Sequence, residues 1–342
     1  MASARPVHLG AELFQEQEGC RSMVEIGYAL SSEEHPAPDL VHQARAAEEA
    51  GFRFALLSDH FHPWISHQGQ SPFAWTVIGA VAQVTQRLRL GTGVTCPTLR
   101  YHPAIIAQAA ATAAQLMPDR FFLGLGSGEN LNEHVVAEGW PSAPVRQAML
   151  AEAVAVIRLL WQGGEQSFDG TYFTVDHARL YSLPAELPPL YIAASGPQAA
   201  ELAGQAGDGL ITTSPDQEVV RAFAGAGGQG KPCYGQLTVC WAETEAAARR
   251  TALEWWPTAA VAGELSQELP LPRHFEQASA TVREEDVAKA VVCGPDPERH
   301  RQAIRQFLEA GIEHVYVHQV GPDQEGFFRF YAREVLPAFS SG

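Results

Sequence analysis

The fold of this chain is decided at Leu56-Leu57-Ser58-Asp59-His60-Phe61-His62-Pro63-Trp64. The first residues close an apolar run from Phe54 that is typical of a buried strand, and the last bring together an acid, imidazoles and an indole. In an α/β barrel, the carboxyl ends of the strands carry the chemistry. We therefore expect Asp59, His60 and Trp64 to form the floor of an active site.

Strand-like and helical patterns alternate on both sides of this stretch. The expected strands lie at 23–30, 54–57, 87–95, 120–126, 189–194, 209–213, 234–241 and 313–318. The expected helices lie at 38–49, 72–83, 103–116, 145–161, 197–206, 216–224, 284–291, 297–310 and 326–339, and a turn with short extended arms lies at 168–175. This alternation predicts an α/β protein with a single (β/α)8 TIM barrel, the alternative being an open doubly wound sheet.

No change of composition marks a linker between two domains. We expect residues 1–22 to form an N-terminal extension and residues 23–342 to form the barrel, with an insertion at about 243–282. Because the extension has no charged-then-apolar layout, it does not resemble a signal peptide, and the expected location is the cytoplasm.

Composition excludes several classes of function. The net charge of −16 argues against nucleic acid, whose phosphates need a basic footprint, so the expected partner is a small-molecule substrate. No apolar run approaches the ~18 residues of a membrane span. The five cysteines form no CxxC pair, which favours reduced buried thiols, and no metal site is expected.

Polar residues follow most of the expected strands, so that together they would ring one mouth. His60 could exchange a proton with a substrate hydroxyl, and Trp64 offers a flat surface for a ring-shaped ligand. Glu129, which follows the fourth strand, is a second candidate for proton transfer. Each also has a structural interpretation, as a partly buried histidine, a packing residue and a carboxylate at a helix start.

Two glycine-containing turns could approach a ligand closely. Gly124-Leu-Gly-Ser-Gly-Glu-Asn130 lacks the spacing and the position of a dinucleotide fingerprint, but its backbone N–H groups could reach a phosphate or a ring oxygen. Ser195-Gly196-Pro197 ends a strand where proline begins a helix. It is either a phosphate cradle or an ordinary turn.

The chain resembles the luciferase-like superfamily, and within it the coenzyme F420-dependent dehydrogenases typified by the glucose-6-phosphate enzymes. The resemblance covers roughly Val24 to Pro337. It rests on five stretches: Ser58–Trp64, Leu90-Gly-Thr-Gly-Val94, Arg100-Tyr-His-Pro-Ala104, Gly124-Leu-Gly-Ser-Gly-Glu-Asn-Leu-Asn-Glu133 and Ala206-Gly-Asp-Gly-Leu-Ile-Thr-Thr-Ser214.

The resemblance implies a (β/α)8 barrel, often a homodimer, that holds the deazaflavin of F420 over a backbone bulge. The bulge would contain a non-proline cis peptide at Gly93-Val94. The residues implied to line the deazaflavin are Asp59, Cys96 (often threonine in the family), Gly126, Ser127, Gly128 and Asn132. Those implied to hold its phosphate tail are Ser195, Gly196, Gln198 and Ala199.

The resemblance also implies catalytic roles. His60 would take the hydroxyl proton as hydride moves to C5 of the deazaflavin. Glu129 would protonate N1, and Trp64 would stabilise the charged ring. The assignment of acid and base within the pair of His60 and Glu129 stays open.

The chain departs from the family where the sugar-phosphate enzymes bind phosphate. Two lysines and an arginine are replaced here by Asp216, approximately Ser266, and Ala290, while Thr213 of the substrate set is retained. Because a phosphate dianion would be repelled by Asp216 without those cations, we expect the substrate not to be glucose 6-phosphate. A neutral alcohol, sugar or lactol is expected instead.

These observations lead to one principal function and three alternatives. The principal function is F420-dependent oxidation at a CH–OH carbon by hydride transfer. The alternatives are reduction of a carbonyl or an activated C=C bond by reduced F420, an FMN-dependent luciferase-like monooxygenase, and a non-catalytic carrier built on a barrel.

Overall fold

Eight parallel strands form a closed barrel in the computed structural model, which describes residues 24–261 and 263–339. The expected extension over residues 1–22 lies outside them. The barrel strands are β1 (Glu25–Leu30), β2 (Phe54–Leu57), β3 (Arg89–Thr92), β4 (Phe121–Leu125), β7 (Leu190–Ala193), β8 (Gly209–Thr212), β9 (Cys233–Cys240) and β11 (His314–Gln319). Because β9 pairs with both β8 and β11, and β11 pairs with β1, the ring closes. The predicted TIM barrel is confirmed, and an open sheet is excluded.

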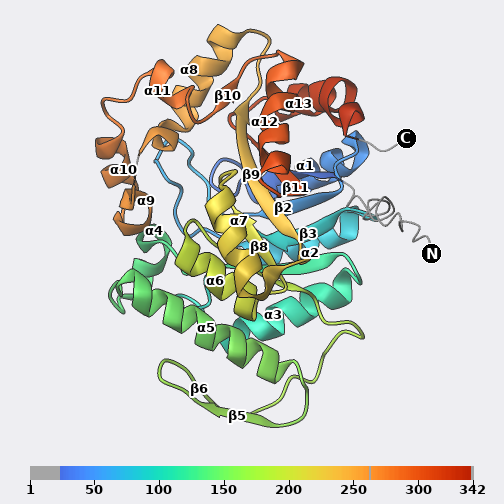
Figure 1. Ribbon diagram of the computed structural model, residues 1–342, viewed down its shortest axis with the longest axis vertical. Coiled ribbons are helices and arrows are strands. Elements are labelled where there is room, and N and C mark those ends of the chain that lie inside the picture. The colour runs from blue at the N-terminus through green and yellow to red at the C-terminus, as the bar shows by residue number, and fades with distance from the viewer. Residues whose placement is uncertain (1–23, 262, 340–342) are drawn as a thin grey trace, which may run out of the picture.

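The main helices surround this ring (Figure 1). They are α1 (Ala37–Ala50), α2 (Ala74–Val84), α3 (Pro103–Leu116), α5 (Ala143–Leu160), α6 (Pro197–Ala206), α7 (Gln217–Phe223), α8 (Glu245–Trp255), α12 (Pro297–Glu309) and α13 (Gln324–Phe330). Proline at the first turn starts α3, α6 and α12, where its missing N–H costs no helical hydrogen bond. Gly51 ends α1 with φ of 102°, a left-handed conformation that favours glycine.

The interior of the barrel is packed with aromatic rings rather than left as a pore. Phe122, Tyr191 and Tyr234 stack on one another with ring centroids 5.0–5.3 Å apart. Tyr316 of β11 belongs to the same buried cluster, and the half-buried Val94 and Ala193 pack against it. Side chains of a strand point alternately into and out of the barrel, and the inward ones fill its interior here. The space for a ligand therefore lies at the carboxyl ends of the strands.

The structure differs from the sequence-based expectations mainly at short or irregular elements. α4 (Asn130–Glu133) and β10 (Val292–Cys293) were not predicted, because four and two residues are too few to show a period. The helix expected at 284–291 is only α11 (Glu284–Val287). The closing helix continues beyond Phe330 as a wider π turn and then a 3-10 turn.

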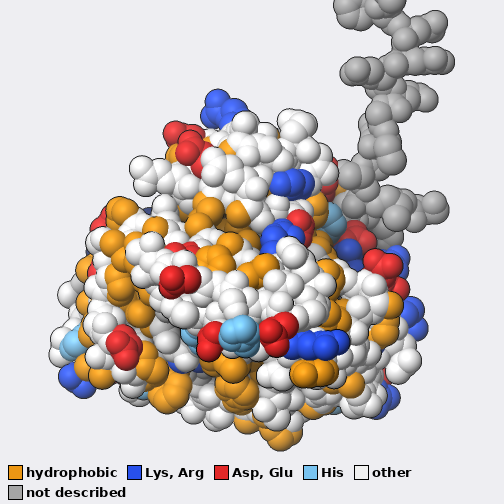
Figure 2. Space-filling view, turned by 90° about the horizontal axis from the view of Figure 1, so that it is seen from below, with side chains coloured by type: hydrophobic (Ala, Val, Ile, Leu, Met, Phe, Trp, Pro, Cys, Tyr) orange, Lys and Arg blue, Asp and Glu red, His pale blue; other side chains and the backbone are white. Residues whose placement is uncertain are grey.

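Two segments lie outside the regular alternation. The expected turn at 168–175 is the hairpin of β5 (Gln166–Asp169) and β6 (Thr174–Ala178). The face of the molecule at this end carries apolar side chains interspersed with charged ones (Figure 2). The segment after β9 contains α8, a 3-10 turn (Pro257–Ala260), α9 (Leu265–Glu268) and α10 (Pro272–Ala278). Figure 1 shows α9 and α10 close to α4, at the mouth of the barrel.

Every helix within the described residues is too short or too polar to cross a bilayer. Four of the five cysteines are described, and each is a free, buried thiol: Cys96, Cys233, Cys240 and Cys293.

Candidate active site

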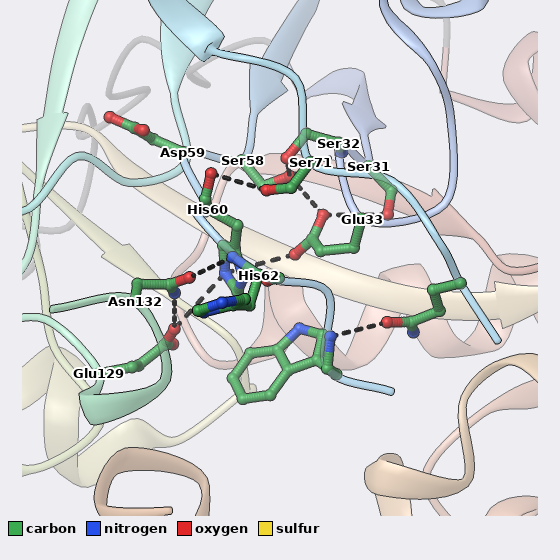
Figure 3. A network of polar contacts seen from close by, with 12 residues as sticks. Ser31, Ser32, Glu33, Ser58, Asp59, His60, His62, Ser71, Glu129 and Asn132 are labelled. Atoms are coloured by element: carbon green, nitrogen blue, oxygen red, sulfur yellow. Dashed lines mark hydrogen bonds and ion pairs between the residues drawn. The ribbon is translucent and has the colours of Figure 1, made fainter. Parts of the chain in front are cut away.

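His60 lies between two carboxylates at the carboxyl end of β2 (Figure 3). Its Nε2 is 3.3 Å from Oε1 of Glu33 and 3.4 Å from Oε2 of Glu129. The side chain of Glu33 is 5% exposed and that of Glu129 31% exposed, so Glu129 is the carboxylate accessible from the mouth. The structure therefore brings His60 and Glu129 together, as the sequence predicted, and adds a third ionisable group.

Hydrogen bonds fix the orientation of both sides of this arrangement. The Nδ1 atom of His60 lies 3.1 Å from the carbonyl of His62, which favours a proton on Nδ1. Asn132 accepts the N–H groups of Phe61 and His62 and donates its side-chain N–H to Glu129 at 3.0 Å. Asn132 thus ties the loop after β2 to the loop after β4.

The environment separates the pKa values of the two carboxylates. Burial raises the pKa of Glu33, but the imidazole of His60 and the hydroxyl of Ser58 more than offset it, so that pKa is lowered overall. Burial also raises the pKa of Glu129, and there the His60 imidazole does not offset it. The lowered pKa favours the ionised form of Glu33, whereas the raised pKa favours the protonated form of Glu129.

The pKa of His60 is raised overall. Burial lowers it, but Glu33 and then Glu129 favour the charged imidazolium more strongly. Hence the resting ring holds a proton to a higher pH than an ordinary histidine.

Trp64 forms one wall of the site. Its indole lies with its ring centroid 5.1 Å from that of His60, at an interplanar angle of 57°. On its other side it contacts Phe275 of α10 edge to face, at 5.2 Å. The segment after β9 therefore supports the indole that faces the mouth, so the position of Trp64 depends on residues far along the chain.

Asp59 is fully buried and forms the centre of a second polar cluster beneath the mouth. Its carboxylate accepts the hydroxyl of Thr95 at 2.7 Å and the hydroxyl of Tyr101 at 3.2 Å. Arg100 donates to it at 3.1 Å and also approaches Glu133 at 3.4 Å. These contacts fasten the loops after β2, β3 and β4 to one another. A contact between Asp59 and a deazaflavin stays a prediction.

The peptide bond between Gly93 and Val94 is cis, at the position that the family resemblance implied. Both residues are partly accessible, whereas the last three residues of β3 before them are buried. Cys96 follows in a buried position 2.9 Å from the hydroxyl of Thr98. Burial and then Glu133 raise the pKa of its thiol well above the usual range, which disfavours the reactive thiolate form.

The glycine-rich loop after β4 passes directly over Cys96. At Gly128, φ is 86° and an added Cβ would lie 2.6 Å from the sulfur, so glycine allows the close approach. Ser127 beside it is partly accessible, while Gly126 is buried. Contacts of this loop with a ligand through its backbone N–H groups stay a prediction.

The predicted phosphate cradle lies at the N-terminus of α6. Gly196 is the N-cap and offers no side-chain cap, which leaves the N–H groups of the first turn available. Ser195 and Gln198 are exposed, and Ala199 is half-buried. Thr213, the predicted substrate contact, is exposed at the end of β8.

Sequence reasoning did not select Glu33 or Arg100 as site residues. Glu33 stands among the polar residues that follow the first strand, and Arg100 lies inside a family stretch, but neither position alone indicates a partner. Both become recognisable only once the adjacent strand ends meet.

The chain belongs to the luciferase-like family. The family model described as luciferase-like monooxygenase matches residues 19–314. This match agrees with the closed parallel barrel and with the polar ring at its carboxyl end.

Two relatives and one solved structure show the nearer similarities. An F420-dependent hydroxymycolic acid dehydrogenase of Mycobacterium tuberculosis is 40% identical over 320 residues, which are 91% of this chain and 87% of the relative. An F420-dependent glucose-6-phosphate dehydrogenase of Beutenbergia cavernae is 36% identical, over 92% and 97% of the two chains. The structure of an F420-dependent secondary alcohol dehydrogenase, in complex with an F420-acetone adduct, matches with a TM-score of 0.86 and 32% identity, over 94% and 100%.

Proposed function

We propose that this protein is a coenzyme F420-dependent oxidoreductase that transfers a hydride between the CH–OH carbon of a non-phosphorylated substrate and the deazaflavin. The observation that carries the proposal is His60, held between Glu33 and Glu129 beside the indole of Trp64 at the barrel mouth. The two relatives described above, which match 91% and 92% of this chain, are named as F420-dependent dehydrogenases.

The residues around the mouth fit a flat tricyclic cofactor. Gly93, Val94, Ser127 and Gly128 are partly accessible above a filled lumen, so a ring can rest on them without displacing the core. The first turn of α6 supplies unpaired N–H groups suited to phosphate. When bound, F420 accepts or returns a hydride at C5.

The protein's own groups would then move the proton. In alcohol oxidation, neutral His60 accepts the hydroxyl proton, and Glu33 stabilises the imidazolium that results. Glu129, whose pKa is raised by burial, is suited to deliver a proton to the reduced ring. In the opposite direction, protonated His60 donates to the carbonyl oxygen.

The positions that correspond to the phosphate-binding cations of the sugar-phosphate enzymes carry Asp216, approximately Ser266, and Ala290 in this chain. Asp216 caps α7 by accepting the N–H of Glu218 at 2.7 Å. Ala290 lines a cavity of about 400 Å³ together with Ala259, Ala260 and Val282. Lys289 also lines this cavity, but Asp286 pairs with it at 2.9 Å. These positions favour an uncharged secondary alcohol, sugar or lactol.

Incubation of the purified protein with oxidised F420 and a panel of alcohols tests this function. We expect deazaflavin absorbance to fall with a neutral secondary alcohol. Glucose 6-phosphate should have a kcat/KM lower by about 10²-fold or more, because each missing charged hydrogen bond is worth roughly 1.5–3 kcal/mol. Absence of F420 binding at micromolar concentration, or copurification of FMN, would contradict the proposal.

The pH dependence of Glu33→Gln tests the proton assignment. Neutral His60 is needed for oxidation, so kcat/KM should rise with pH through a pKa above the ordinary value of about 6.5. Removal of the Glu33 charge favours neutral His60, so this rise should move to lower pH. Stopped-flow measurement of deazaflavin reduction from pH 5 to 9 records the shift. An unchanged profile would show that Glu33 does not act on His60.

The assembly and the location stay proposals. We propose a homodimer, supported by the exposed apolar side chains of Phe73, Ile105 and Leu116 beside α2 and on α3. Light scattering should then give twice the chain mass of 37.0 kDa.

We also propose a cytoplasmic enzyme, supported by the free thiols of the described cysteines.

A further inference from the structure

A second carboxylate–imidazole pair lies directly beside the catalytic one. Glu34, the neighbour of Glu33, accepts Nε2–H of His318 at 2.8 Å, and the two side chains are 0% and 3% exposed. His318 lies on β11, two residues beyond Tyr316 of the lumen cluster, so the alternation of the strand directs it toward the interior as well. The mouth thus contains two adjacent glutamates, each of which contacts an imidazole.

Glu34 connects the loop after β1 to the loop after β11. Its second oxygen accepts the backbone N–H of Gly321 at 2.9 Å. One residue further along, His35 lies 3.3 Å from the side chain of Gln324, which in turn accepts the hydroxyl of Tyr28 at 2.6 Å. The loop that carries Glu33 is therefore fastened by its next two residues to the end of β11, the strand that pairs with β1.

The contacts of Glu33 itself run to the loop after β2 and not to β11, and its carbonyl accepts the N–H of Gln70 at 3.1 Å. Apart from His60, its carboxylate accepts hydroxyls from Ser31 at 3.2 Å and from Ser58 at 2.5 Å. These are short, rotatable side chains near the same two strand ends. The direction of Glu33 toward His60 therefore depends on where the backbone of the loop is held.

We propose that Glu34 and His318 are positioning residues that hold Glu33 against His60. This inference rests on the proposed function, because it concerns how the proton-accepting histidine is prepared. A buried carboxylate paired with a buried imidazole is costly to desolvate, so a role in specifying one arrangement accounts for this pair better than a gain in stability. Here it specifies the place of the loop between β1 and α1.

The ring of His318 has few other contacts, because its Nδ1 atom is buried without a hydrogen-bond partner among the described residues. Trp256 contacts the ring edge to face at a centroid distance of 4.5 Å. The ring is thus held by Glu34 on one nitrogen and by an indole on its face, and these two contacts fix its position.

The charges around Glu34 come from several elements, so a pH test must separate them. On its own loop lie Glu33 and His35, and His60 and Glu129 face Glu33 from the loops after β2 and β4. The remaining ionisable neighbours are Tyr28 of β1, Asp39 of α1, Cys240 of β9 and His318 of β11.

A double-mutant cycle tests whether Glu34 acts through Glu33. Glu34→Gln should lower kcat/KM for alcohol oxidation roughly tenfold to a hundredfold, because sub-ångström placement of catalytic groups is lost. It should move the acidic limb of the pH profile to lower pH, as Glu33→Gln does. The double variant should move the limb no further than Glu33→Gln alone, and the Kd for F420 should stay within about twofold.

Variants of His318 test the same proposal without changing Glu34. His318→Gln retains an N–H donor for Glu34 and should keep the wild-type profile, whereas His318→Leu should reproduce Glu34→Gln. His300 provides the matched control, since this buried imidazole contacts Tyr331 and the carbonyl of Gly294 away from the site. His300→Gln should lower stability without moving the pH profile.

Additive shifts in the cycle, or an unmoved profile in both Glu34→Gln and His318→Leu, would overturn the positioning role. These outcomes differ from failure of the proposed function, in which wild-type protein itself would show no F420-dependent turnover.

Discussion

Replacement of His60 by alanine is expected to lower F420-dependent turnover about 10²–10⁴-fold, while the Kd for F420 stays within a few-fold of wild type. The imidazole is the group at the mouth whose nitrogen faces both Glu33 and Glu129. Without it, the substrate hydroxyl has no positioned proton acceptor. Steady-state assays and fluorescence titration with F420 measure the two quantities separately.

His67→Ala is the matched control, because His67 lies in the same loop but is 46% exposed and contacts Glu254 instead. Its turnover should equal that of wild type. If His60→Ala retained full turnover, the proton assignment would be wrong. If the wild type and His67→Ala both bound F420 but turned over no alcohol, the protein would be a carrier and not an enzyme.

Arg100→Ala is expected to lower the free energy of unfolding by about 3–5 kcal/mol, the range for leaving buried charges without their partner. The guanidinium is 7% exposed, and it contacts Asp59 at 3.1 Å and Glu133 at 3.4 Å. Its removal leaves two carboxylates buried beside each other beneath the mouth. Urea unfolding followed by tryptophan fluorescence measures the loss. Arg45→Ala is the control, because the exposed side chain of Arg45 on α1 pairs only with the exposed Glu49, and its removal should change the free energy of unfolding little.

The deficit of Arg100→Ala should shrink as the pH falls. In the wild type, burial raises the pKa of Glu133 and Arg100 lowers it, with a raised pKa overall. Without Arg100 the folded-state pKa rises further above the unfolded value. A carboxyl of this kind destabilises the fold only when ionised, so the penalty is absent below the unfolded pKa and grows as the pH rises toward the folded one. A deficit that is equal at pH 5 and pH 8 would contradict this account.

The order of the elements could be predicted from the sequence because it depends on local patterns. The apolar run of β2 and the proline that starts α3 each indicate their structure without reference to distant residues. The abrupt change to polar residues after Leu57 also placed Asp59 and His60 at a strand end. The cis peptide at Gly93-Val94 has no local signal and was anticipated through the family resemblance alone.

The sequence by itself determined which residues stand at strand ends, and hence which side chains could reach the mouth. Only the tertiary structure decided which of them meet. β1 pairs with β2 so that Leu30 lies beside Leu57, and Glu33 and His60 each follow three residues later. That register sets the partner of His60, because the neighbour across a parallel sheet is fixed by strand pairing and not by separation along the chain.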